Sequence, residues 1–423
     1  MTKAGIGHQR RARRQGFTLL ELMVALTVGG IAITSIYAIG AATTRQFHQQ
    51  QSVAGTQSSV RDALDRVKRD IARAGYLSTP NANVADDVTG LPIEGCGTAA
   101  APLDDPTGGG RLAAISQFTN DLPALTGTDP TGDNVANGFT HDEIRLIANY
   151  QTSDQYPGVR LPQGSNNSVL VPQDWHAFRR DFTDWYVDGD YDHNDLAFND
   201  AFTIGRMIRI MTTTRKKHFA TLTAVADPGD APQGADDPAL LTFNPPIPAG
   251  CLKDVDGGWV APVNVIRYFL QDAPDSETGR FSANTGPMAQ LIRQETLPGD
   301  KGVPLANNPA HTRAVLDFAV SFNLRFQLTA DTAAGEEDSY TLNTLTNSAP
   351  AVNGNPEWVR AVEIDLAART ALSDPRFMNP WVQASCADQL CFQVFDEADN
   401  QGAARVRRAR AVVFLPNVAF EGY

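Results

Sequence analysis

The most specific chemistry in this chain lies in the stretch Arg13-Arg14-Gln15-Gly16-Phe17-Thr18-Leu19-Leu20-Glu21. A basic segment ends at Gly16, and Phe17 opens a long apolar run that reaches Ala42. Glu21 is the only charged residue in that run. Because a carboxylate is costly inside a membrane-spanning helix, an acid at such a position usually has a function. Glu21 is therefore the first candidate functional residue.

The apolar run is long enough to cross a membrane. It has 26 residues, from Phe17 to Ala42, which span about 39 Å as a helix against a hydrocarbon core of about 30 Å. Residues 1–16 contain five basic residues and no acid, which predicts a cytoplasmic N-terminus and a periplasmic C-terminal part. The alternative is an ordinary secretory signal that is cut after the small residues near Ala38 to Ala42.

The charge balance makes nucleic acid an unexpected partner. The chain carries a formal net charge of −13, and the part that follows residue 16 carries −18. General nucleic-acid binding needs a basic face. A local basic cluster does occur near the C-terminus, and we expect it to lie on the solvated edge of a strand; its members are Arg405, Arg407, Arg408 and Arg410.

Four cysteines favour disulfides if the C-terminal part lies in an oxidising compartment. Four cysteines allow three connectivities. Cys386 and Cys391 are close enough in sequence to close a small loop, which would leave Cys96 and Cys251 as the second pair. Metal binding is the alternative, but no C-x-x-C pair with histidines at finger spacing is present.

The helix is expected to continue well beyond the apolar run. No proline occurs between Phe17 and Tyr76, and apolar residues recur at helical spacing in its second half, which predicts a stripe packed on a globular domain. Gly75 is placed to end the helix. The stripe consists of Val60, Leu64, Val67, Ile71 and Ala74.

The rest of the chain reads as an antiparallel sheet domain with long loops. Proline, glycine and aspartate dominate residues 77–140, which predicts loops with a short strand or two. Alternating apolar residues predict strands beyond this segment; the expected strands are 143–150, 203–211, 219–225, 263–270, 315–328, 359–368, 391–395 and 410–415. The expected fold class is therefore α+β, with one long N-terminal helix packed on a mostly antiparallel sheet.

The N-terminal pattern resembles the signal of type IV prepilins. The resemblance implies that a prepilin peptidase cuts between Gly16 and Phe17 and that the new amino group of Phe17 is methylated. It also implies that Glu21 neutralises the N-terminus of a neighbouring subunit and so sets the register between subunits. The alternative for Glu21 is that it reaches the membrane interface without a partner. The implied regions are a leader (1–16), a membrane or filament-core helix (17–42), an amphipathic helix (43–76) and a periplasmic domain (77–423).

The segment Asp70-Ile71-Ala72-Arg73-Ala74-Gly75-Tyr76 looks like the helix end of the PilW family of minor pilins. The late strand 359–369 and the arginine-rich strand that ends at Leu415-Pro416-Asn417 are also similar to that family. The resemblance implies a minor pilin in the inner membrane that takes part in pilus assembly, with other minor pilins, the major pilin and the inner-membrane assembly platform as partners. Roles in twitching motility, adhesion or DNA uptake would follow. Two alternatives stay open: a J-type pseudopilin of type II secretion, and a filament-tip adhesin.

An acidic cluster around residue 190 has alternating oxygen ligands, as a Ca²⁺ loop would. The candidate ligands are Asp188, Asp190, Asp192 and Asn194. The EF-hand pattern requires glycine and glutamate where this chain has His193 and Asn199, so that match fails. The expected cofactor is therefore none, with Ca²⁺ as the alternative to an exposed acidic turn.

The motifs of common hydrolases and nucleotide-binding enzymes are missing from the sequence. It contains no G-x-S-x-G, no H-E-x-x-H and no P-loop, and its seven histidines show no ligand spacing. The sequence therefore predicts a subunit without enzymatic activity.

Overall fold

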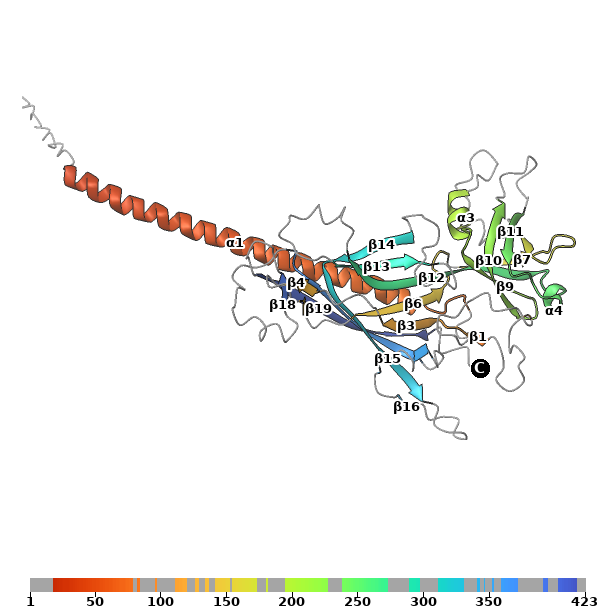
Figure 1. Ribbon diagram of the computed structural model, residues 1–423. Coiled ribbons are helices and arrows are strands. Elements are labelled where there is room, and N and C mark those ends of the chain that lie inside the picture. Colours follow the sequence, from red (N-terminus) through yellow and green to blue (C-terminus); the bar gives the residue numbers. More distant parts are fainter. Residues whose placement is uncertain are drawn as a thin grey trace, which may run out of the picture. The chain divides into compact units, whose positions relative to one another are not determined.

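The structure of the chain is a computed structural model (Figure 1). The residues that the structure describes are 18–78, 82–83, 96, 111–119, 126–128, 134–136, 141–152, 154–172, 180–181, 195–226, 238–272, 289–296, 311–330, 341–342, 346, 352–353, 359–371, 391–394 and 402–416.

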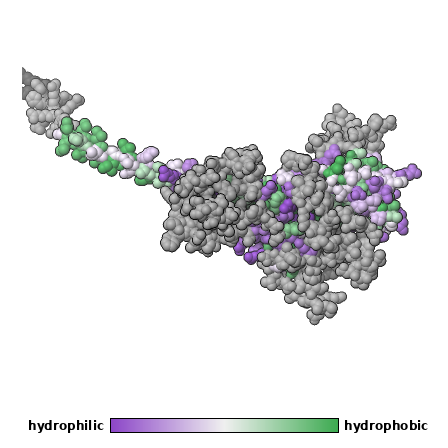
Figure 2. All heavy atoms as spheres, in the orientation of Figure 1, coloured by the Kyte–Doolittle hydropathy of each residue, from purple (hydrophilic) through white to green (hydrophobic). Residues whose placement is uncertain are grey.

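A single long helix, α1 (Leu19–Ala72), opens the described part. This agrees with the helix expected from Phe17 to Ala74. Internal contacts divide the chain into residues 1–55 and residues 56–423, and α1 runs through this boundary. In the first part of α1 the apolar side chains are exposed, for example Leu19 at 79% and Ile36 at 70%. Figure 2 shows this apolar surface along the helix. In the described part of the chain, α1 alone is long and apolar enough to cross a membrane.

The described part of residues 56–423 contains two antiparallel sheets and two short ribbons. The ten-stranded sheet comprises β3 (Ile115–Thr119), β6 (Asp142–Ala148), β7 (Tyr156–Val159), β8 (Ser168–Val171), β9 (Met207–Met211), β10 (Lys217–Ala226), β11 (Ala239–Asn244), β12 (Gly258–Asp272), β13 (Ala289–Glu295) and β14 (Thr312–Asp317). The five-stranded sheet comprises β15 (Ala319–Ala330), β16 (Thr341–Leu342), β17 (Val359–Arg369), β18 (Cys391–Val394) and β19 (Gly402–Phe414). The ribbons pair β1 (Ala82–Asn83) with β2 (Arg111–Leu112), and β4 (Thr126–Thr128) with β5 (Asn134–Ala136).

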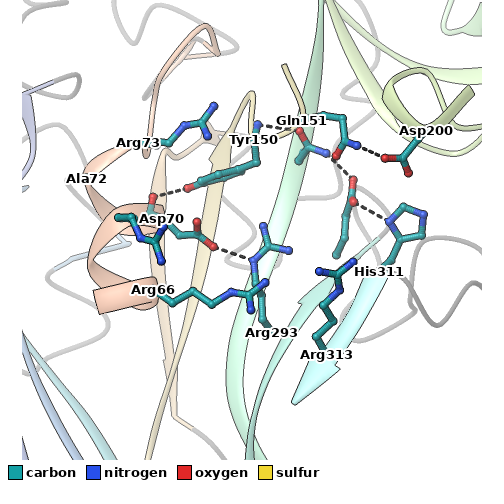
Figure 3. A pocket seen from close by; sticks show the side chains of 13 residues that line it. Arg66, Asp70, Ala72, Arg73, Tyr150, Gln151, Asp200, Arg293, His311 and Arg313 are labelled. Carbon is teal, nitrogen blue, oxygen red and sulfur yellow. Dashed lines mark hydrogen bonds and ion pairs between the residues drawn. The ribbon is translucent and has the colours of Figure 1, made fainter. Parts of the chain in front are cut away.

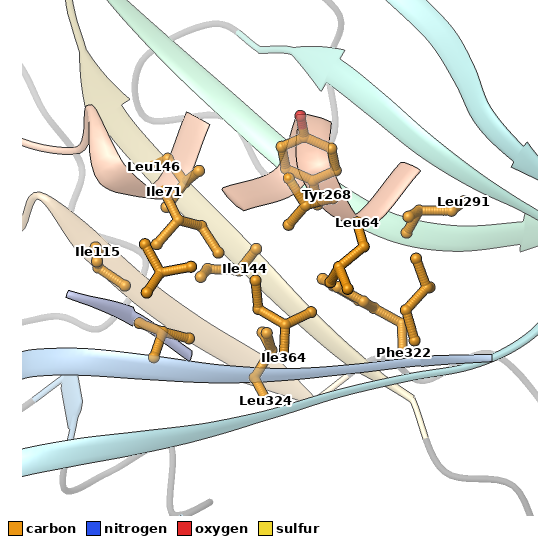
Figure 4. Close-up of a cluster of buried hydrophobic side chains, with 14 of the residues drawn as sticks. Leu64, Ile71, Ile115, Ile144, Leu146, Tyr268, Leu291, Phe322, Leu324 and Ile364 are labelled. Atoms are coloured by element: carbon orange, nitrogen blue, oxygen red, sulfur yellow. The ribbon is translucent and has the colours of Figure 1, made fainter. Parts of the chain in front are cut away.

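The second half of α1 packs its apolar stripe into the main hydrophobic core. Val60, Leu64, Val67, Ile71 and Ala74 are all buried, as the spacing predicted. They share one cluster with side chains of the larger sheet and of the smaller sheet (Figure 4). The helix stripe therefore contributes to a core that both sheets line, and removing it would leave apolar side chains of both sheets uncovered.

The chain changes sheets at Phe318. The sequence predicted one strand over residues 315–328, and this prediction was wrong: Phe318 has a positive φ of 55° and separates β14 from β15. β14 pairs with β13 in the larger sheet, whereas β15 pairs with β17 in the smaller one. The apolar alternation runs through this corner because Phe318 is itself buried, so periodicity gave no sign of the break.

A second core lies in an insertion lobe, which we define as β7 to β11 with the short helices α3 (Asp195–Ala201) and α4 (Ala249–Leu252). β12 connects this lobe to the main core. Its first half pairs with β7 and β9, and its second half pairs with β6 and β13. Pro262, which has no backbone N–H to donate, lies near the point where the partners change.

Some strand predictions need further correction. The expected strand 203–211 begins only at Met207, because Gly205 with a φ of 91° forms a turn before it. The sequence also missed β7, β8, β11 and β13. β18 pairs with residues 402–405 of β19 and so covers only Arg405 of the basic cluster near the C-terminus. Among the described strands, Arg407, Arg408 and Arg410 have β17 as their only neighbour, so this part of the cluster lies on the expected strand edge. Asp365 of β17 forms ion pairs with Arg408 and Arg410.

A matched pair of valine substitutions tests how much the helix stripe contributes to stability. Val67→Ala removes two methyl groups from a side chain that is 0% exposed, and we expect a loss of about 2 kcal/mol in unfolding free energy. Val412→Ala makes the same change where the side chain is 52% exposed, and we expect a change within about 0.5 kcal/mol. Chemical unfolding of the full chain in detergent measures both. Equal effects of the two substitutions would contradict this packing.

Candidate functional site

The start of α1 is closed by a reciprocal pair of side chains, Thr18 and Glu21. The Glu21 backbone N–H donates to Thr18 Oγ1 at 3.2 Å, and the Thr18 backbone N–H donates to Glu21 Oε2 at 3.0 Å. The Thr18 hydroxyl also donates to Glu21 Oε2 at 3.0 Å. This is a capping box, with Thr18 as the N-cap and Glu21 three residues later.

The capping box gives Glu21 a contact within its own helix. It satisfies backbone donors that a helix start otherwise leaves unpaired, and it places a negative charge at the positive end of the helix dipole. The sequence carries the signal for it, Thr18-Leu19-Leu20-Glu21, but the capping box was not among the sequence predictions. Gly16 and Phe17, the expected cleavage and methylation positions, lie outside the described residues.

The other end of α1 is fastened by Asp70, one residue before the buried Ile71. The Asp70 carboxylate accepts hydrogen bonds from the Tyr268 hydroxyl at 2.6 Å and from Arg293 Nε at 2.7 Å. Tyr150 donates to the Asp70 backbone carbonyl at 2.7 Å. Burial and the Asp70 charge raise the pKa of Tyr268 well above its ordinary value, so its hydroxyl keeps the proton that it donates. These contacts join the helix to β12 and β13.

The residues after Asp70 hold the end of the helix against the C-terminal end of β6. Arg73 Nη2 donates to the Asn149 carbonyl at 2.9 Å, and its guanidinium lies over the rings of Tyr76 and Tyr150, at 6.0 and 5.7 Å from the ring centroids. Gly75 has a φ of 80°, which a residue without a side chain adopts at little cost. Its N–H donates to the Ile147 carbonyl at 2.9 Å. The segment from Asp70 to Tyr76 therefore closes the helix and joins it to the end of β6.

A buried ionic network lies next to the end of the helix. Glu295 accepts from Arg206 Nε at 2.8 Å, from the His311 ring at 3.0 Å and from Asn264 at 2.7 Å. Burial would raise the pKa of Glu295, but the hydrogen bonds from His311 and Arg206 outweigh it and lower this pKa to about 2. The Tyr150 backbone N–H donates to Asn264 at 2.9 Å, so Tyr150 connects this network to Asp70.

These two networks border a cavity of about 680 Å³ in residues 56–423 (Figure 3). Five arginines and three carboxylates line it, so its lining has a formal charge of +2 when His311 is counted as neutral. The charged residues are Arg66, Arg69, Arg73, Arg293, Arg313, Asp70, Asp200 and Glu295. No local sequence signal predicts this cavity, because its lining comes from residues far apart in the chain.

The candidate disulfide and Ca²⁺ residues lie partly inside and partly outside the described part of the chain. A disulfide joins Cys96 to Cys251, with 5.3 Å between the Cα atoms. Cys386 and the side chain of Cys391 lie outside the described residues, as do the candidate Ca²⁺ ligands Asp188, Asp190, Asp192 and Asn194. Among the residues that the structure describes, no group of three or more His, Cys, Asp or Glu could hold a metal ion.

Comparison with known proteins identifies the N-terminal segment. Residues 11–37 match the family described as the prokaryotic N-terminal methylation motif. The layout of the structure, a long apolar N-terminal helix followed by a mostly antiparallel β-sheet domain, is pilin-like. No curated protein and no solved structure matches it.

The motif match agrees with the layout of the structure. It covers Gly16, Phe17, Thr18 and Glu21 and the first part of the exposed apolar helix. A type IV pilin-like or pseudopilin-like chain with this motif implies processing by prepilin peptidase, in a pilus or in a secretion system. The apolar helix fits anchoring in a membrane.

Two aspartates on the same helix test whether Asp70 fastens the end of α1. Asp70→Asn leaves Arg293 without its counter-charge in a largely buried position, where the side chains are 16% and 19% exposed. We expect a loss of about 2–4 kcal/mol in unfolding free energy. Asp65→Asn is the control, because the Asp65 side chain is 65% exposed and its pair with Lys68 lies at the surface; we expect less than about 0.5 kcal/mol. Equal stability of the two variants would contradict the role of Asp70.

Proposed function

We propose that this chain is a minor pilin of the PilW type, a non-enzymatic subunit that takes part in the assembly of a type IV pilus. The observation that carries the proposal is the methylation motif over residues 11–37, followed directly by an exposed apolar helix whose second half belongs to a two-sheet core. A filament subunit needs both parts: an apolar segment to sit in the membrane and then in the filament, and a folded domain that travels with it.

In this proposal the chain lies in the inner membrane before assembly, with residues 1–16 in the cytoplasm and the β-rich domain in the periplasm. Prepilin peptidase cuts after Gly16, and Phe17 becomes the methylated N-terminus. The exposed apolar side chains of α1 first meet lipid and then the helices of other minor pilins and the major pilin. The inner-membrane assembly platform moves the subunit from one environment to the other.

The helix start supplies the charge that such a transfer requires. Cleavage creates an amine at Phe17, and an ammonium group in an apolar surrounding costs several kcal/mol unless it meets a negative charge. Glu21 lies at the first turn with its carboxylate exposed and held only by Thr18 among the described residues. We propose that it neutralises the amine of a neighbouring subunit, while the capping box holds it in the single subunit.

Three features support the minor pilin over the abundant subunit and over the pseudopilin. The helix ends with the Asp70, Arg73, Gly75 and Tyr76 element, and each of these four residues has a defined contact or conformation there. The insertion lobe adds a second core with its own disulfide. The chain is also long for a major pilin or a J-type pseudopilin, at 423 residues.

Substitutions at the helix start separate charge from capping. Glu21→Gln keeps a side chain that can complete the capping box but removes the negative charge, whereas Thr18→Ala removes the cap hydroxyl and keeps the charge. Each variant is expressed in the source bacterium after deletion of its own copy of the gene. We expect Glu21→Gln to lower the amount of subunit in sheared filaments by about tenfold or more, because the amine of the neighbouring subunit stays unpaired. We expect Thr18→Ala to have a smaller effect, since a lost N-cap costs about 1 kcal/mol.

The same strains also test which machine uses the subunit. Deletion of the gene should remove surface pili and leave protein secretion intact, and the wild-type gene should restore the pili. Loss of secretion with normal pili would contradict the proposal and favour a J-type pseudopilin. Incorporation of Glu21→Gln at the wild-type level would contradict the role given to this carboxylate.

A further inference from the structure

The cavity at the C-terminal end of α1 contains more positive charge than its surroundings neutralise. It lies wholly within residues 56–423, and its lining comes from α1, the end of β6, α3, β12, β13 and β14. Its volume of about 680 Å³ falls in the range of small-molecule pockets.

All three carboxylates of the lining already have partners. Asp70 holds Arg293 and the Tyr268 hydroxyl. Glu295 is held by Arg206, His311 and Asn264, and Arg206 is not itself part of the lining. Asp200 accepts a hydrogen bond from the Gln151 amide. These carboxylates therefore stabilise the contacts between the elements that line the cavity.

Four of the five arginines of the lining have no carboxylate partner among the described residues. Arg69 and Arg73 donate only to backbone carbonyl oxygens. Arg66 and Arg313 make neither a hydrogen bond nor an ion pair with any residue that the structure describes. Figure 3 shows Arg66, Arg293 and Arg313 extending toward the same part of the cavity.

The helix dipole explains part of this charge. Cations near the C-terminus of a helix are favourable; Arg69 lies in the last turn of α1, and Arg73 follows directly after the helix. It does not explain Arg293 and Arg313, which come from neighbouring strands, β13 and β14. Bringing cations from three elements to one cavity is repulsive unless an anion joins them.

We propose that this cavity binds a compact oxyanion with phosphate-type oxygens, such as a phosphate or pyrophosphate group. Guanidinium groups bind such oxygens through parallel N–H donors and keep their charge at any physiological pH. Arg66 and Arg313 would contact the ligand directly, and Arg293, fixed by Asp70, would form the back of the site. The chain as a whole carries −13, so an extended polyanion would be repelled outside the cavity, which favours a small ligand.

Isothermal titration of the full chain in detergent micelles, at fixed ionic strength, tests the site with inorganic phosphate and pyrophosphate as probes. We expect saturable binding of both, tighter for pyrophosphate. The double variant Arg66→Gln/Arg313→Gln should bind about tenfold more weakly or worse, since two charge-assisted hydrogen-bonding groups are lost. The charge-matched control is Arg61→Gln/Arg325→Gln, which changes two exposed arginines outside the cavity and should bind like the wild type.

Either of two results would overturn the proposal: no saturable binding by the wild type at millimolar concentrations of the probes, or equal binding by the double variant and the wild type. A melting curve shows whether the double variant is folded. If it is not, Arg313→Gln alone replaces it, because Arg313 is exposed and its removal leaves the core intact. That single variant must still weaken pyrophosphate binding relative to Arg325→Gln, and equal binding by the two would refute the site.

Discussion

One apolar stripe on α1 organises the folded domain. The stripe consists of Val60, Leu64, Val67, Ile71 and Ala74, which are buried in a core that the larger and the smaller sheet both line. Burial of apolar surface is non-directional, so it would not by itself fix the position of the helix along its axis relative to the two sheets. Asp70 supplies the directional contact, because its carboxylate is held by Tyr268 and Arg293 from two neighbouring strands. The stripe therefore stabilises the fold, and the hydrogen bonds of Asp70 set the position of the helix.

The hydrogen bonds around Asp70 continue to the insertion lobe. Tyr150 contacts the Asp70 carbonyl through its hydroxyl and Asn264 through its backbone N–H. Asn264 donates to Glu295, which also holds Arg206 at the start of β9. A continuous set of hydrogen bonds therefore runs from the helix end to the lobe. The cationic cavity lies beside this set, where the acids that stabilise the walls leave several guanidinium groups without counter-charges.

The helix and its stripe could be predicted from the sequence because their signals are local: an uninterrupted run without proline, apolar residues every three or four positions, and Gly75 at the end. The capping box was also readable as Thr18-x-x-Glu21 and was overlooked. Other features had no local signal. The break at Phe318 keeps the apolar alternation intact, and Glu295 meets Arg206 from a distance of 89 residues in sequence. The cavity is likewise a product of topology, since its arginines come from α1, β13 and β14.

We propose that this chain enters a type IV filament machine through its N-terminal motif. The intact mass and the N-terminal sequence of the protein from membranes, in cells with and without prepilin peptidase, test this proposal. We predict a chain that starts at N-methylated Phe17 only when the peptidase is present, and a chain that retains residues 1–16 when it is absent. A chain that starts near residue 40, or one that is identical in the two strains, would contradict the claim and assign the apolar segment to ordinary export or anchoring.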